Sequence, residues 1–133
     1  DGFVSLAKQK RGFVPFVNLN DLLLPWRDVM VDTVRLDRPD LSMRQWALLL
    51  TVYLTPGPHT VRRLSEELQV PKPAISRALD ALSIHGLVKR ARDPADRRIV
   101  LVQKTQDGSL FIDQFAAIVE ERDRQSDLGP YYG

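Results

Sequence analysis

The residues best suited to intermolecular contacts form a short basic and small-polar group near the middle of the chain. Lys72 and Arg77 supply charge, and Ser76 supplies a hydroxyl. Pro73 and Ala74 are small, so a helix that carries them can approach another molecule closely. A helix is about 10 to 12 Å across, and the major groove of B-DNA is about 12 Å wide. These residues therefore predict a helix face that donates hydrogen bonds to base edges and phosphates.

A second basic group lies at Arg97 and Arg98, after the turn-forming pair Asp93-Pro94. Guanidinium groups at the tip of a hairpin can contact phosphates or enter a narrow minor groove. Asp96 allows two interpretations: it supports the tip, or it forms with Arg98 only a weak surface ion pair. Cations outnumber carboxylates between residues 61 and 98, whereas the reverse holds for the rest of the chain. The positive charge is thus concentrated around the two basic groups.

The elements that must position these groups are marked by caps and turns. Ser42 can accept a hydrogen bond from the amide of Gln45, whose side chain can return to the Ser42 amide, so a helix begins there. It should run to about Leu54, because Pro56-Gly57-Pro58 follows.

Two further helices should hold the first basic group. Thr60 can cap a short helix, and after a turn Pro73 suits the first position of the next helix, where an amide would be unpaired anyway. Gly86 can adopt the left-handed conformation that ends this second helix, with Leu87 folding back on Leu82.

The remaining expected elements are two strands, 87–92 and 98–103, that form a hairpin, an early helix from Leu22 or Pro25 to Leu36, and a last helix over about 105–124. The expected fold class is mainly α with a small β-hairpin wing, a winged helix-turn-helix. We divide the chain into an N-terminal arm (1–18), one domain (19–125) and a flexible tail (126–133). The basic stretch Lys8 to Arg11 is interpreted as a disordered or packed end, with a minor-groove arm as the alternative.

Four segments together are similar to the DNA-binding core of the MarR family: Leu64 to Leu68, Lys72 to Leu79, His85 to Arg90 and Asp93 to Arg98. The resemblance implies that Lys72, Pro73, Ser76 and Arg77 lie on a recognition helix. It also implies that Arg98 is a wing arginine that touches DNA, with Asp96 supporting the wing. The implied partners are double-stranded DNA, a second copy in a homodimer, and a small aromatic effector.

Three large side chains, Trp26, Met30 and Trp46, are candidates for an effector pocket of the kind that the resemblance implies. The alternative is that they are core residues, since aromatic and Met side chains on helix faces are usually buried.

The chain has no Cys and two His, which excludes disulfides and cysteine nucleophiles and makes a metal site or cofactor unexpected. His59 is expected in a loop and His85 near a helix end. The sequence offers no nucleophile beside a base and no phosphate loop, so we expect that the protein is not an enzyme. We also expect a cytoplasmic protein that does not bind a membrane. The alternative to a transcriptional regulator is a winged-helix module that binds protein within a larger transcription or replication assembly.

Overall fold

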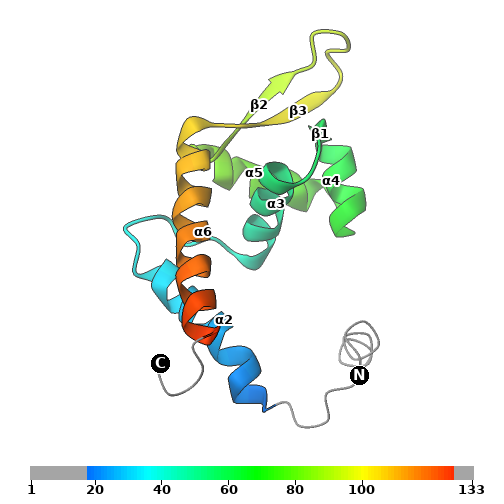
Figure 1. Cartoon of the computed structure of the whole chain (residues 1–133). Helices are drawn as coiled ribbons and strands as arrows, with labels where there is room; N and C mark the ends of the chain where they lie inside the picture. Colours follow the sequence, from blue (N-terminus) through cyan, green and yellow to red (C-terminus); the bar gives the residue numbers. More distant parts are fainter. Residues whose placement is uncertain (1–17, 128–133) are drawn as a thin grey trace.

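The computed structural model describes residues 18–127, which form five helices and one three-stranded antiparallel sheet (Figure 1). In chain order the elements are α2 (Leu19–Val34), α3 (Met43–Leu54), β1 (His59–Thr60), α4 (Val61–Leu68), α5 (Lys72–Ile84), β2 (Val88–Arg92), β3 (Val100–Lys104) and α6 (Gln106–Asp127). This architecture confirms the expected winged helix-turn-helix. The basic stretch Lys8 to Arg11 and residues 128–133 lie outside the described residues. No helix within 18–127 is long and apolar enough to cross a bilayer.

The hydrophobic core lies between α3, α4, α5 and the sheet. Leu48, Leu49 and Val52 of α3 and Leu79 and Leu82 of α5 are completely buried. Full burial of each such side chain contributes about 1.5 to 3 kcal/mol. In contrast, α2 contributes no buried side chain and packs along α6 outside this core (Figure 1).

The helix ends follow the local signals in the sequence. Ser42 and Gln45 form the expected capping box, with hydrogen bonds of 2.9 and 3.1 Å. Thr60 caps α4 by accepting a hydrogen bond from the amide of residue 63 at 3.1 Å. Gly86 adopts a φ of 73°, and the Leu87 amide donates to the Leu82 carbonyl at 2.9 Å, which is the expected Schellman ending of α5.

The first helix begins earlier than the sequence analysis expects. α2 starts at Leu19 rather than at Leu22 or Pro25, because the side chain of Asn18 accepts a hydrogen bond from the Asn20 amide at 2.8 Å. Pro25 therefore lies inside α2 rather than in its first turn, and the helix lacks one backbone hydrogen bond there. The helix then ends at Val34, before the expected Leu36.

The other helix and strand boundaries differ from the expected ones by a few residues. α5 begins at Lys72, so Pro73 is its second residue rather than its first, a position where a missing amide is equally harmless. β2 and β3 begin at Val88 and Val100, later than expected. α6 continues to Asp127, beyond the expected helix end and beyond the domain limit set at residue 125.

The strand β1 is absent from the sequence analysis, and the expectation that His59 lies in a loop is wrong. His59 pairs with Val102 and Thr60 with Leu101, so β1 extends the sheet in the order β1-β3-β2. A strand of two residues is too short to show an alternation of apolar and polar residues in the sequence. Its partner is more than forty residues away, so only the tertiary structure brings the two together.

One half-buried junction ties α3 to the ends of α5 and β3. The Tyr53 hydroxyl donates to the Leu87 carbonyl at 2.6 Å and accepts from the Thr105 amide at 3.0 Å. The Thr105 hydroxyl in turn donates to the Gly86 carbonyl at 2.6 Å. A Cβ at Gly108 would lie 1.8 Å from the Tyr53 hydroxyl oxygen, so only glycine allows α6 to start this close to α3. The junction fixes α6 relative to the C-terminal end of α5.

Candidate nucleic-acid interface

The outward face of α5 presents the first basic group to solvent. Lys72, Pro73 and Arg77 are exposed, while Ala74 and Ser76 are half-buried beside them. The opposite face of the same helix carries the core residues Ile75, Ala78, Leu79 and Leu82. The orientation of α5 is therefore fixed, because any rotation would expose core side chains and bury charges.

The N-terminal end of α5 adds to the positive potential of this face. It has no side-chain cap and no acidic residue in its first turn. The positive end of the helix dipole favours an anion at this end. Lys72 and Arg77 thus lie where a phosphate would be attracted by backbone and side chains together.

The wing tip is ordered by the side chains of Asp93 and Asp96. Asp93 Oδ1 accepts from the Ala95 amide at 2.9 Å. Asp96 Oδ1 accepts from the backbone amide of Arg98 at 3.1 Å and from its Nε at 3.0 Å, and Asp96 Oδ2 accepts from its Nη2 at 3.0 Å. These hydrogen bonds from Arg98 lower the pKa of Asp96 below its ordinary value, and Asp96 raises the pKa of Arg98. The ion pair between the two residues is therefore also a contact that orders the tip.

Arg98 remains open to solvent despite this pairing, since its side chain is 91% exposed. Arg97 is exposed as well, and its carbonyl accepts a hydrogen bond from Arg92 Nη1 at 2.8 Å. The tip therefore presents two guanidinium groups beyond the end of the sheet, where the wing extends away from the helices (Figure 1).

Arg90 connects the wing to α5 through a contact that the sequence analysis does not predict. Its guanidinium forms an ion pair with Asp80 on the outward side of α5. Side chains alternate between the two faces of a strand, so Arg90 and Arg92 lie on the same side of β2 as the buried Val88. This alternation is visible in the sequence and could have identified both arginines as neighbours on one face. The pair links the orientation of the wing to that of α5.

Charge is distributed unevenly over the described residues. On α2 and α6, Arg27, Arg122 and Arg124 each contact a carboxylate. We call residues 43–104, from α3 to β3, the winged lobe. Among the described residues, the cations of this lobe that form no ion pair are Arg44, Arg63, Lys72, Arg77, Lys89, Arg92, Arg97 and Lys104. The winged lobe therefore carries the uncompensated positive charge, as expected of a surface that binds a polyanion.

The three candidate pocket residues lie in different surroundings. Trp46 stacks on Phe111 with ring centroids 5.3 Å apart and packs against the core. Trp26 is 63% exposed and Met30 is 50% exposed on α2. The core interpretation therefore holds for Trp46 and is wrong for Trp26 and Met30. The cavity at the base of the wing has other lining residues, so the structure does not bring the three residues together there.

Comparison with known proteins agrees with this geometry. The MarR family model matches residues 40–99, which contain α3, α4, α5, β2 and the wing tip. This part of the chain is similar to the MarR family. The fold of the chain is similar to that of the transcriptional regulator Tm0710 from Thermotoga maritima, at 27% identity over 81% of this chain and 72% of that one, with a TM-score of 0.62.

A similar fold also occurs in two solved complexes. A MepR variant from S. aureus, bound to an oligodeoxyribonucleotide, is 20% identical over 86% of this chain and 85% of that one, with a TM-score of 0.70. CouR from Rhodococcus jostii, bound to p-coumaroyl-CoA, is 21% identical over 96% of this chain and 80% of that one, with a TM-score of 0.59. These two likenesses concern the fold alone.

Proposed function

We propose that this chain is a sequence-specific transcriptional regulator that binds double-stranded DNA. In this proposal α5 enters the major groove and the wing lies along the adjacent minor groove. The proposal depends on one observation above all: Lys72 and Arg77 are exposed on α5 without ion-pair partners among the described residues, on the same lobe as the wing-tip guanidinium groups. The similarity to the MarR family and the oligodeoxyribonucleotide complex of the MepR variant support it.

Each candidate residue then has a distinct part in DNA binding. Arg77 and Ser76 reach base edges or phosphates, while Lys72 contacts a phosphate at the N-terminal end of α5. Pro73 and Ala74 have small side chains, so the first turn of α5 can approach the DNA closely. Arg98 enters the minor groove, Arg97 contacts the backbone, and Asp96 keeps the tip in shape.

We further propose that the active form is a homodimer joined through α2. One face of α2 carries large apolar side chains at spacings of three and four residues, all 49% exposed or more: Leu19, Leu22, Leu23, Trp26, Met30 and Val34. The other face carries Asp28 and Asp32, which contact Arg122 of α6. The apolar stripe thus points away from the rest of the described chain, and a second α2 with the same stripe would cover it.

A small aromatic effector remains part of the proposal, supported by the acyl-CoA complex of the similarly folded CouR. The assignment of Trp26, Met30 and Trp46 to its pocket stays a prediction, as does the cytoplasmic location. A winged-helix module that binds only protein has no need for a cationic recognition face, so the exposed charges on α5 favour the DNA-binding proposal over it.

Binding to duplex DNA at several salt concentrations tests the proposal. Affinity for a mixed-sequence duplex should fall steeply as salt rises, because contacts between cations and phosphates release counterions. Selection from a random duplex library should then enrich a defined site. Arg77→Ala should weaken binding to that site by about 1 to 3 kcal/mol, with little change in thermal stability.

Arg124→Ala is the matched control, because it removes an exposed arginine at the far end of α6. It should leave DNA affinity almost unchanged. If the chain does not bind duplex DNA at low salt, the proposal is wrong and the protein-binding alternative gains support. If Arg77→Ala binds as tightly as the unchanged protein, α5 is not the recognition element.

A further inference from the structure

The acidic residue of α5, Asp80, lies on the outward side of the helix, one turn beyond Arg77. A carboxylate beside a surface that binds a polyanion repels the phosphates, so by itself Asp80 opposes the proposed contact. Its charge is compensated by Arg90 of β2, with which it forms an ion pair. Attraction to DNA therefore does not explain why α5 carries this carboxylate.

A gain in stability does not explain the pair either. The Asp80 side chain is 54% exposed and the Arg90 side chain is 31% exposed, and ion pairs at such positions add little to the free energy of unfolding. The pair is distinguished by the elements that it joins, because it runs from α5 to the wing. The ion pair between Arg62 and Glu66, in contrast, lies within α4.

The hairpin of the wing is packed into the core only at its base. Val88 and Val102 are buried there, and Arg90 lies opposite Val102 in the register of the two strands. Beyond this point the wing extends away from the helices (Figure 1). Within the part of the chain that the structure describes, the side-chain hydrogen bonds of residues 91–98 stay inside the hairpin. The ion pair of Arg90 is thus the polar contact with a helix that lies nearest the tip.

A second arginine continues this link toward the tip. Arg92 extends from the same side of β2 as Arg90, two residues further along the strand. Its Nη1 donates to the carbonyl oxygen of Arg97 at 2.8 Å. A series of contacts therefore runs from Asp80 on α5 through β2 to the turn that carries the wing-tip guanidinium groups.

We propose that Asp80 and Arg90 are positioning residues that hold α5 and the wing as one unit, so that the major-groove and minor-groove contacts are made together. This inference rests on the proposed function and adds a source of sequence selection to it. Once one contact has formed, a wing held in place makes the other with little further loss of entropy. A DNA site is then bound tightly only where its major-groove bases and the adjacent minor groove match the spacing that the pair fixes.

Asp80→Asn separates this role from that of a simple surface carboxylate. A simple carboxylate repels every duplex equally, so its loss would leave the ratio of affinities for the selected site and for a mixed-sequence duplex unchanged. Loss of a positioning residue should lower this ratio about threefold, since coupled contacts lose binding energy that independent contacts keep. Fluorescence anisotropy on the two duplexes at one salt concentration measures the ratio. The melting temperature should hardly change, because the pair is exposed.

A double-mutant cycle measures the coupling itself. Arg98→Ala should lower affinity for the selected site about tenfold in the unchanged protein, but only about threefold in the Asp80→Asn background, where the wing is no longer held against α5. Exchange of the two charges, Asp80→Arg together with Arg90→Asp, should restore the tenfold effect.

Glu66→Gln is the matched control, because it also removes the carboxylate of an exposed ion pair from the winged lobe, but one that lies within a single helix. In this background Arg98→Ala should still cost about tenfold.

NMR relaxation of the free ¹⁵N-labelled chain adds a readout that needs no DNA. Asp80→Asn should lower the order parameters of the Arg97, Arg98 and Ile99 amides, and Glu66→Gln should not. The inference is overturned if Asp80→Asn leaves these order parameters or the affinity ratio unchanged, or if Arg98→Ala costs tenfold in both backgrounds. If the unchanged chain binds no duplex while Asp80→Asn loosens the wing, the proposed function is wrong and the positioning of the wing stands.

Discussion

At the tip of the wing, a single carboxylate organises the guanidinium that is proposed to enter DNA. Asp96 accepts both from the backbone amide and from the side chain of Arg98, yet the Arg98 side chain stays almost fully exposed. The arginine is thus held in place before DNA arrives. Less conformational entropy is lost on docking than for a free arginine.

Replacing these residues should affect DNA binding without affecting the fold. Arg98→Ala should lower affinity about tenfold, the scale of one charge-assisted hydrogen bond, and more on A·T-rich sites, whose narrow minor groove attracts a guanidinium. Asp96→Ala should weaken binding indirectly, because the tip loses its internal hydrogen bonds. Fluorescence anisotropy on an A·T-rich and a G·C-rich duplex at two salt concentrations measures both effects.

Arg97→Ala is the control within the same turn. Its loss should lower the salt dependence of binding by about one phosphate contact or less, without changing the preference between the two duplexes. Unchanged affinities of the Arg98 and Asp96 variants on both duplexes would show that the wing does not enter DNA.

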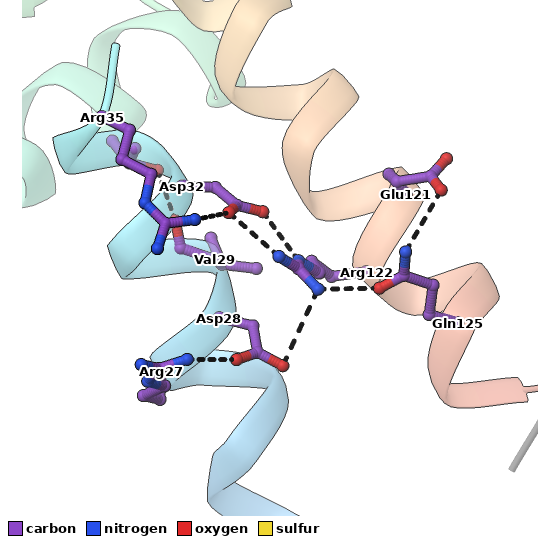
Figure 2. A network of polar contacts seen from close by, with 9 residues as sticks. Arg27, Asp28, Val29, Asp32, Arg35, Glu121, Arg122 and Gln125 are labelled. Atoms are coloured by element: carbon purple, nitrogen blue, oxygen red, sulfur yellow. Dashed lines mark hydrogen bonds and ion pairs between the residues drawn. The ribbon is translucent and has the colours of Figure 1, made fainter. Parts of the chain in front are cut away.

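At the scale of elements, α2 is joined to α6 by charge rather than by a shared core. Arg122 Nε donates to Asp32 Oδ2 at 2.7 Å and Arg122 Nη2 donates to Asp32 Oδ1 at 3.0 Å, with Asp28 a further 4.0 Å contact (Figure 2). Gln125 receives a hydrogen bond from the same guanidinium at 2.8 Å, so Arg122 sits between the two helices with several partners. The α2–α6 pairing should therefore respond to pH.

The hydrogen bonds from Arg122 lower the pKa of Asp32 in the folded protein. The resulting stabilisation is fully present above the ordinary Asp value of 3.8 and is lost as pH falls below it, through the lowered pKa. Asp32→Asn should consequently unfold at a lower temperature than the unchanged protein at pH 7. The difference between the two melting temperatures should shrink once the pH falls below 3.8.

Glu121→Gln provides the comparison, because Glu121 is an exposed residue whose ion pair with Arg124 lies within α6. Its effect on melting temperature should be small at every pH. Equal melting temperatures for Asp32→Asn and the unchanged protein at pH 7 would mean that the contact with Arg122 does not hold α2 on α6.

At the scale of the whole molecule, the exposed stripe on α2 decides whether the chain works alone or in pairs. Leu23→Asp should prevent the proposed homodimer, since burial of a leucine contributes about 1.5 to 3 kcal/mol and a symmetric dimer buries it twice. Light scattering after size-exclusion chromatography would show a monomer at concentrations where the unchanged chain is a dimer. The affinity of Leu23→Asp for an operator with two half-sites should also fall, because a monomer binds only one half-site.

Leu24→Asp is a closely matched control, because Leu24 is 50% exposed and Leu23 is 54% exposed. The two neighbours differ in direction, since successive helical residues point about 100° apart and Leu24 lies off the stripe. Leu24→Asp should remain dimeric. A monomeric unchanged protein, or identical behaviour of the two variants, would exclude a dimer formed through this stripe.

The sequence by itself determines the features that depend on interactions between residues a few positions apart. The capping box of Ser42, the cap of Thr60 and the left-handed Gly86 all arise from hydrogen bonds or backbone preferences spanning one helical turn. The order of helices, the hairpin and the outward face of α5 follow from them and from hydrophobic periodicity. Most of the fold and the candidate DNA-binding residues were therefore predictable, apart from boundaries that shift by a few residues.

Only the tertiary structure decides which surfaces meet. The sequence shows that α2 has an apolar face, but it cannot show that this face points outward while Asp32 turns toward Arg122, ninety residues away. Pairing of His59 with Val102 and the close approach of Gly108 to Tyr53 likewise join distant segments. Burial and ion pairing depend on what the whole chain places opposite a residue, and that information is not contained in the spacing of its neighbours.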